Sequence, residues 1–305
     1  MTTDTMGNSW QVKRLAGALG AEVHGINLAQ ADDGDIAEIK RLLGEHMVLF
    51  FPDQNLSMED HVALGRPFGP LEGHPNLAER NSEQHPEIFQ LAASQGGIAD
   101  EWHTDLTFME QPALMSILNM RKCPETGGDT MWSNLCAAYD ALSAPMQEMC
   151  DGLTALHDAH PHGRADKMTI HPVVRVLPDT EAGPGRKALY VNEHFTRRIV
   201  EMSMEESNNL LSFLTRWVQS PRFTVRYSWR EGCIGMWDNR CTQHYVLNDF
   251  DEERIIQRVT VMGDHVEGVG ARWQPWTERT SRSAMGRHDR QLSGYLCGQS
   301  AEAAE

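Results

Sequence analysis

The chain has 305 residues, 40% of them hydrophobic and 23% charged, with a formal net charge of −16 at pH 7. This composition is ordinary for a globular protein, and the acidic balance argues against nucleic acid or an anionic membrane surface as the main partner. The longest apolar run, Met47 to Phe51, is far too short to span a bilayer, and the N-terminus lacks the apolar core of a signal peptide. Six cysteines without a CxxC pair are typical of free thiols in a reducing compartment, so we expect a cytoplasmic protein.

The predicted elements are mainly strands, with helices between them. Helices are predicted over about 35–45, from Ser57, over about 135–152 and from Ser203, where Ser57 and Ser203 each have an acidic residue three positions later, as in a capping box. The strand-like segments are MVLFF (47–51), EIFQLAA (87–93), LMSILNM (114–120), HPVVRVL (171–177), KALYVNE (187–193), FTVRYSW (223–229), CIGMWD (233–238) and RIIQRVTVMG (254–263). Turn residues between 177 and 187 predict a hairpin, and Gly127–Gly128 predicts a turn between strands. The pattern predicts a single domain over residues 1–305, mainly β with peripheral helices, as in a sandwich or jelly roll.

A histidine and an aspartate two residues apart, His103 and Asp105, stand in the stretch WHTDLTFME. On a strand this spacing places both side chains on one face, where a divalent metal ion could bind. The spacing alone is weak evidence, since 14 histidines and 43 acidic residues among 305 give about two such triplets by chance, and the sequence has three.

The stretch from Trp237 to Gly263 adds a third metal ligand candidate, His244, and two arginines, Arg254 and Arg258. On a strand the two arginines share one face, and buried there they would need anions. The alternative is a helix in which the DEER run supplies surface ion pairs, but the run Val259-Thr-Val261 favours the strand. Two histidines and one carboxylate form the facial set of non-haem Fe(II) oxygenases, and each arginine could hold an oxyanion.

Several motifs resemble one family, in the family's order: WHTDLTF (102–108), GGDT (127–130), HPVVR (171–175), VNEHFTRRIV (191–200) and WDNRCTQHY (237–245). The family is the taurine dioxygenase-like (TauD/TfdA) family of Fe(II)/2-oxoglutarate-dependent dioxygenases, whose fold is a double-stranded β-helix (jelly roll). The resemblance runs from about Val12 to Asp264 and leaves 265–305 as a C-terminal extension.

The resemblance implies a role for each of eight residues. His103, Asp105 and His244 would bind iron, while Thr130 and Arg254 would hold the distal carboxylate of 2-oxoglutarate. Arg258 would face the anionic head of the substrate, His74 matches a substrate-binding histidine, and Phe195 matches an aromatic wall. For the last two the alternatives are a loop histidine and a core phenylalanine, and Trp102 and Trp237 are interpreted as packing residues.

The chain departs from the taurine-specific pattern at three places. Ala99 replaces an asparagine, Asn76–Leu77 replaces an aromatic residue, and the segment between His157 and His171 is much shorter than the family's lid. These departures argue against taurine and predict a more open pocket.

The implied activity is hydroxylation of a small anionic organic substrate: a sulfonate, a sulfate ester, or an aryloxy or alkyl carboxylate. The reaction would use Fe(II), 2-oxoglutarate and O2, would give succinate and CO2, and could cleave the hydroxylated product. Desaturation by the same cofactors and a non-oxidative metal-binding barrel protein are the alternatives. A homo-oligomer, dimer or tetramer, is expected by analogy.

Overall fold

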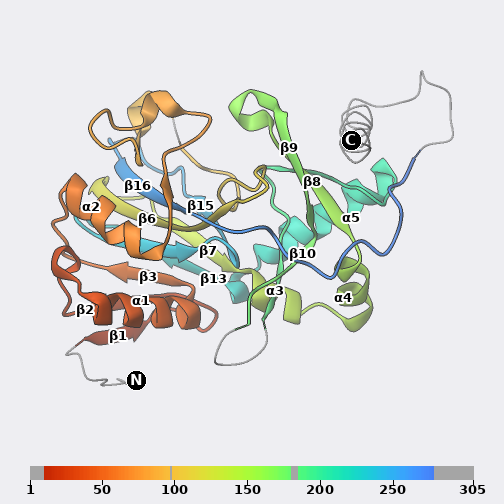
Figure 1. Ribbon diagram of the computed structural model, residues 1–305, viewed down its shortest axis with the longest axis horizontal. Helices are drawn as coiled ribbons and strands as arrows, with labels where there is room; N and C mark the ends of the chain where they lie inside the picture. Colours follow the sequence, from red (N-terminus) through yellow and green to blue (C-terminus); the bar gives the residue numbers. More distant parts are fainter. Residues whose placement is uncertain (1–9, 97, 180–184, 278–305) are drawn as a thin grey trace.

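The computed structural model describes residues 10–96, 98–179 and 185–277. Its largest sheet has eight strands, and β6 lies between β14 and β16 in it. Figure 1 shows β6 and β16 side by side. In order along this sheet the strands are β1 (Gln11–Arg14), β2 (Ala21–His24), β3 (Val48–Phe51), β14 (Ile234–Asp238), β6 (Ala113–Lys122), β16 (Ile255–Met262) and β4 (Leu71–Glu72), and β5 (Ile88–Ala92) also pairs with β16. All these pairings are antiparallel except that of β2 with β3.

Three smaller sheets complete the β structure of the described residues. One is β13 (Thr224–Tyr227), β7 (Thr130–Asn134) and β15 (Thr242–Val246), in that order. A second is β12 (Thr196–Ile199), β8 (Thr154–Ala159) and β9 (Arg164–Pro172), and the third pairs β10 (Val174–Val176) with β11 (Lys187–Leu189). The β10–β11 pair confirms the predicted hairpin, although residues 180–184 of its turn lie outside the described residues.

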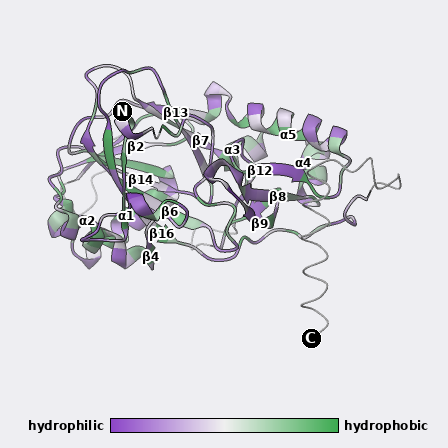
Figure 2. Ribbon diagram, turned by 90° about the horizontal axis from the view of Figure 1, so that it is seen from above, coloured by the Kyte–Doolittle hydropathy of each residue, from purple (hydrophilic) through white to green (hydrophobic). Residues whose placement is uncertain are grey.

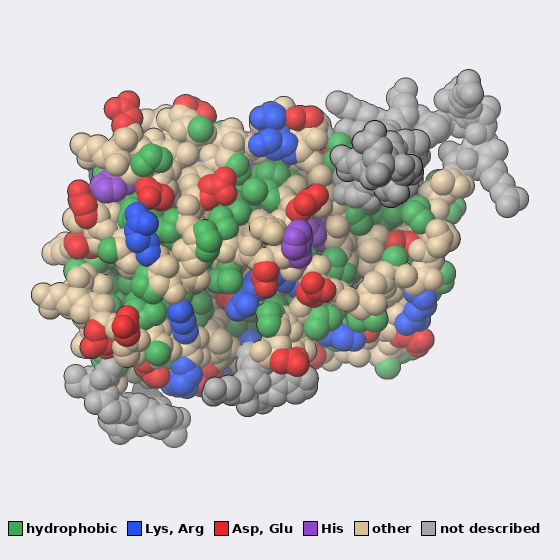
Figure 3. All heavy atoms as spheres, in the orientation of Figure 1, with side chains coloured by type: hydrophobic (Ala, Val, Ile, Leu, Met, Phe, Trp, Pro, Cys, Tyr) green, Lys and Arg blue, Asp and Glu red, His purple; other side chains and the backbone are tan. Residues whose placement is uncertain are grey.

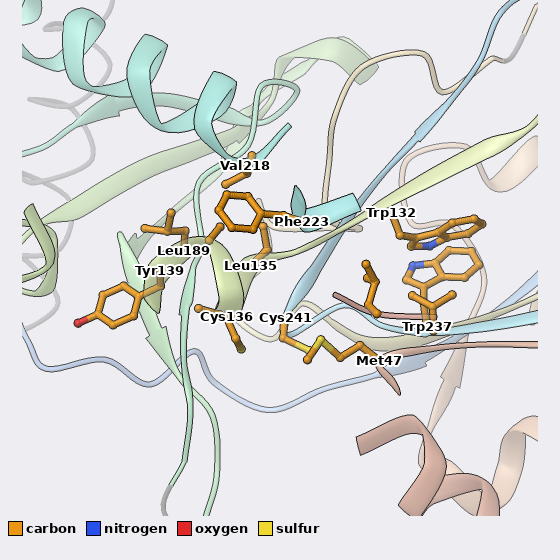
Figure 4. Packing of buried hydrophobic residues seen from close by; sticks show 14 of the residues in the cluster. Met47, Trp132, Leu135, Cys136, Tyr139, Leu189, Val218, Phe223, Trp237 and Cys241 are labelled. Atoms are coloured by element: carbon orange, nitrogen blue, oxygen red, sulfur yellow. The ribbon is translucent and has the colours of Figure 1, made fainter. Parts of the chain in front are cut away.

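The main core lies between the large sheet and the β13–β7–β15 sheet. Phe50 of β3 stacks on Tyr227 of β13 with ring centroids 3.6 Å apart, and Trp132 of β7 meets Trp237 of β14 at 5.8 Å (Figure 4). Five of the six cysteines lie in the described residues, all as free thiols, and four of them are buried. The predicted free, mostly packed thiols are confirmed for these five.

The other face of the large sheet is covered by α1 (Asp33–His46). Ile36, Ile39, Leu42 and Leu43 of this helix pack against apolar side chains of β3, β6 and β14. Because both faces of β3 are buried, its sequence VLFF is apolar throughout instead of alternating. The mainly β fold with peripheral helices is therefore as predicted.

The helix starts expected at two serines are confirmed. Ser57 caps α2 (Met58–Gly65) and Ser203 caps α5 (Met204–Val218), each with the reciprocal hydrogen bonds of a capping box. Helix α5 buries Leu210, Leu214 and Val218, and Figure 2 shows hydrophilic and hydrophobic residues along it. These starts are local in origin, because the cap and its partner lie within one turn.

Three element predictions need correction. The helix expected over 135–152 is two helices, α3 (Leu135–Asp140) and α4 (Ala144–Asp151), separated by an extended Ser143. Pro145 in the first turn of α4 explains the break, because proline lacks an N–H and clashes with the carbonyl four residues earlier. HPVVRVL is divided between β9 and β10, and the strand predicted over 187–193 ends at Leu189.

None of the helices in the described part of the chain combines the length and apolarity needed to cross a bilayer. On the face shown in Figure 3, acidic and basic side chains are interspersed. Of the C-terminal extension expected over 265–305, only residues 265–277 are described.

Candidate active site

The metal-ligand candidates come together where residue 103 pairs with β15. The backbones of His103 and His244 form an isolated antiparallel bridge, with N···O distances of 3.1 and 2.8 Å. Asp105 does not continue a strand, as the two-residue spacing predicted, but begins a turn in which Leu106 has a φ of +59°. The turn brings the carboxylate back toward the two imidazoles, so the expected convergence is correct but its predicted cause is wrong.

The three side chains offer ligand atoms that all lie within 4.8 Å of one another. Nε2 of His103 is 3.8 Å from Oδ1 of Asp105, and the rings of His103 and His244 are 4.0 Å apart. Nδ1 of His103 lies 2.7 Å from the carbonyl oxygen of Glu101, which can only accept, so this nitrogen carries the proton and Nε2 is bare. A bare Nε2 held by a backbone carbonyl is the tautomer that a metal ion requires.

The protonation states of the triad also fit a metal ion. Burial, followed by the nearby His244, lowers the pKa of His103, and burial lowers the pKa of His244 to about 4. Burial disfavours the Asp105 carboxylate, but Arg258 and the two histidines outweigh it and lower the pKa of Asp105. Two neutral imidazoles and one carboxylate are therefore available at neutral pH, and no ligand has to lose a proton when the metal binds.

Two residues that the motif analysis did not single out support the Asp105 carboxylate, Ser116 directly and Asn239 through Ser116. Ser116 on β6 donates to Oδ2 of Asp105 at 2.8 Å and accepts from Nδ2 of Asn239 at 3.0 Å. The Asn239 amide oxygen accepts from the indole of Trp237 at 3.0 Å. Asn239 lies inside the WDNR motif, whereas Ser116 carries no sequence signal, because only the pairing of β6 with β14 brings it here.

We expect Ser116→Ala to weaken metal binding by roughly 10- to 100-fold, the usual cost of losing a residue that orients a metal ligand. The measurement is anaerobic titration of the apoprotein with Fe(II) or Mn(II). Ser207→Ala is the matched control, since Ser207 is also buried but its hydroxyl accepts from the backbone N–H of Ile199. Equal metal affinity in wild type and Ser116→Ala would show that Asp105 needs no such support.

Arg254 is a buried cation without an acidic partner in the described residues. Its side chain donates to the carbonyl oxygen of Gly128 at 3.1 Å and to the hydroxyl of Thr130 at 3.3 Å. Burial lowers its pKa to about 10, so a carboxylate arriving beside it would restore the balance of charge. Gly127 and Gly128 adopt φ angles of +82° and +67°, which confirms the predicted turn and lets the backbone approach the guanidinium.

A cavity of about 1200 Å³ opens beside the triad, lined by His103 and Asp105 and by the three predicted substrate residues Arg258, His74 and Phe195. His74 and Phe195 are buried in its wall, 7% and 2% exposed. Nη1 of Arg258 lies 2.7 Å from Oδ1 of Asp105, while its Nε is buried without a partner in the described residues. Sequence reasoning did not single out His162 and His194, which also line the cavity.

Comparison with known proteins places the chain in a family. The model of the taurine catabolism dioxygenase TauD, TfdA family matches residues 11–260. The chain belongs to this family. An alkylsulfatase of Acinetobacter baylyi is 35% identical over 85% of this chain and 87% of its own length. An alpha-ketoglutarate-dependent sulfate ester dioxygenase of Pseudomonas putida is 34% identical over 85% and 91%. The crystal structure of a taurine dioxygenase from Burkholderia xenovorans superposes with a TM-score of 0.76 at 37% identity, covering 85% of this chain and 93% of that one.

Family membership confirms the motif resemblance, the jelly-roll fold and the enzyme class. The chain is an Fe(II)- and 2-oxoglutarate-dependent dioxygenase that uses O2. The non-oxidative barrel protein is accordingly not supported. The family does not by itself assign the residues that hold each reactant.

Proposed function

We propose that this dioxygenase hydroxylates a sulfonate, a sulfate ester, or an aryloxy or alkyl carboxylate at the carbon nearest the triad, giving succinate and CO2. His103, Asp105 and His244 bind iron, and Thr130 and Arg254 hold the distal carboxylate of 2-oxoglutarate. Arg258 and His74 bind the anionic head of the substrate, with Phe195 as an aromatic wall. Where the hydroxylated carbon bears oxygen or sulfur, the product falls apart.

The proposal rests chiefly on the surroundings of the Arg258 side chain. It lies in the cavity wall beside the metal ligands, with a side chain only 11% exposed, and its one acidic partner in the described residues is Asp105. An Asp105 carboxylate that binds a metal ion has less charge to offer Arg258, so a second anion is needed to balance this cation. The unpartnered Nε gives that anion an N–H to bind.

The remaining cavity wall suits a carbon skeleton. Apolar side chains line part of the same cavity, namely Leu77, Phe89, Leu91, Ile98, Ala99 and Leu106. A cationic group beside the triad together with these apolar side chains fits an anion with an alkyl or aryl body. The sequence predicts a more open pocket from the short segment between His157 and His171, and this stays a prediction.

When bound, iron with O2 and 2-oxoglutarate supplies the oxidising chemistry, and the chain's own residues supply the positioning. The buried Thr130 and Arg254 would fix one end of the cosubstrate, and Arg258 would fix the head of the substrate. Leu106 and Phe195 exclude water around the reacting carbon. Holding both anions by charge-assisted hydrogen bonds sets which carbon meets the metal centre.

Replacing Arg258 with glutamine should weaken the binding of the substrate by about 2–5 kcal/mol, the scale of a lost buried charge pair. The assay is succinate release from a panel of sulfonates, sulfate esters and aryloxy acids, with product analysis to distinguish a gain of oxygen from a loss of two hydrogens. The visible charge-transfer band formed anaerobically with Fe(II) and 2-oxoglutarate should survive in the variant.

A neutral amide analogue of the best substrate provides the control. The amide should bind to wild type as poorly as the acid binds to Arg258→Gln. In the variant, changing the acid to the amide should lower the affinity little further. If wild type binds the amide and the acid equally well, the substrate is not recognised through its charge, and the proposed function is wrong.

We also propose that the enzyme is cytoplasmic and homo-oligomeric. The free thiols support the first proposal, since an oxidising compartment favours disulfides. Size-exclusion chromatography with light scattering tests the proposed homo-oligomer, and a monomer at micromolar concentration would contradict it.

A further inference from the structure

His162 enters the substrate cavity from the shortened segment between β8 and β9. A single turn of 3-10 helix, His160–His162, connects the two strands. The turn is tied at both ends: the His160 N–H donates to Asp158 at 3.0 Å, and the Gly163 N–H donates to the His160 carbonyl at 2.8 Å. Gly163 follows with a φ of +70°, a conformation that glycine adopts without strain and that returns the chain into β9. The shortness of this loop therefore fixes where His162 lies.

The ring of His162 is packed into the cavity wall. Its centroid lies 4.9 Å from that of His74, 5.5 Å from Phe195 and 5.9 Å from Phe108. Neither ring nitrogen has a partner in the described part of the chain, and Nδ1 is fully shielded. Because Nδ1 is shielded, Nε2 is the nitrogen that can meet a ligand. A shielded nitrogen without a hydrogen bond, as at Nδ1, is unusual, since buried polar atoms are nearly always paired.

His162 also lies within electrostatic reach of the proposed head-group site. Burial is the largest cause of the lowered pKa of His74, to about 3, and Arg258 and His162 are the next two. For His162 the causes are burial, then His194 and Arg258. His74, His162 and Arg258 are therefore neighbours, and the two neutral imidazoles can each still donate one N–H.

We propose that His162 is a specificity-determining residue that donates a third hydrogen bond to the substrate head. This inference rests on the proposed function, in which Arg258 and His74 hold that head. A carboxylate has two oxygens in one plane, which the guanidinium and His74 satisfy. A sulfate or sulfonate has three terminal oxygens arranged around sulfur, so its third oxygen can meet His162. The third donor favours the sulfur oxyanions, because a carboxylate leaves the imidazole unpaired.

The test compares an n-alkyl sulfate with an n-alkyl carboxylate of equal chain length, using wild type, His162→Phe and His162→Gln with Fe(II) and 2-oxoglutarate. Phenylalanine preserves the packing of the ring but removes both nitrogens, whereas glutamine retains a donor. We expect His162→Phe to lower kcat/KM for the sulfate about tenfold or more and to leave the carboxylate unchanged, and His162→Gln to recover part of the loss. The anaerobic visible band with 2-oxoglutarate should be the same in all three proteins, which verifies the fold and the cosubstrate site.

The outcomes separate this inference from the proposed function. If wild type uses organic anions but His162→Phe lowers both substrates equally or changes neither, His162 is only a wall and the inference is wrong. A wild-type enzyme that prefers the carboxylate would overturn it as well. If wild type uses neither these two compounds nor any sulfonate, sulfate ester or aryloxy acid of the panel, the proposed function fails, and the inference that rests on it fails too.

Discussion

Replacing any one of His103, Asp105 and His244 with alanine should abolish turnover. The reason is that only three protein ligands hold an ion that must keep open positions for its reactants, so none can be lost. Metal content after dialysis and succinate release measure the two consequences. His244→Ala is the most informative variant, because Nδ1 of His244 has no partner in the described residues and its removal breaks no hydrogen bond there.

The fold should survive these substitutions, which thermal unfolding in the absence of metal can verify. Asp105 requires a matched control, because its loss leaves the guanidinium of Arg258, 2.7 Å away, without an acidic partner. Asp105→Asn removes the charge but retains an oxygen that can accept from Ser116. Substantial succinate production by folded His244→Ala would refute the assignment of the triad.

Arg254→Ala should weaken the binding of 2-oxoglutarate by about 2–5 kcal/mol, which raises its Kd roughly 30-fold to several thousand-fold. The physical reason is that Arg254 is a buried guanidinium, 7% exposed, that donates to a carbonyl and a hydroxyl and forms no ion pair with a carboxylate of the described residues. A cosubstrate carboxylate would complete the charge pair in a dry pocket, and the variant cannot form that pair. Anaerobic titration of the Fe(II) protein with 2-oxoglutarate, followed by the visible band, measures the change.

Two further variants make this result specific. Arg254→Lys keeps the charge but loses the planar fork, so its Kd should fall between wild type and alanine. Arg222→Ala should bind 2-oxoglutarate as wild type does, since Arg222 stacks on Trp217 and Phe223 at the start of β13. An unchanged Kd in Arg254→Ala would mean that another cation holds the cosubstrate.

Local chemistry made several elements predictable. The caps at Ser57 and Ser203 act within one helical turn, so sequence alone places the starts of α2 and α5. The β-branched residues around Arg258 likewise favour the strand β16 over a helix, and the structure confirms it. The break at Pro145 also has a local cause, but the apolar spacing continues across it and therefore predicts one helix.

The sequence by itself determined which ligand types were available, because motifs preserve chemistry: two histidines, one aspartate and two arginines, of which Arg258 lies on β16 and Arg254 directly before it. Only the tertiary structure decided how they meet. His103 and His244 lie far apart in the chain and become neighbours through one β-bridge, while Asp105 reaches them through a turn instead of the predicted strand. Ser116 and His162 have no sequence signal. Pairing of strands places Ser116 beside Asp105, and a tight loop places His162 beside His74. Spacing along a chain specifies one face of one element, whereas a site assembled from several elements depends on long-range pairing.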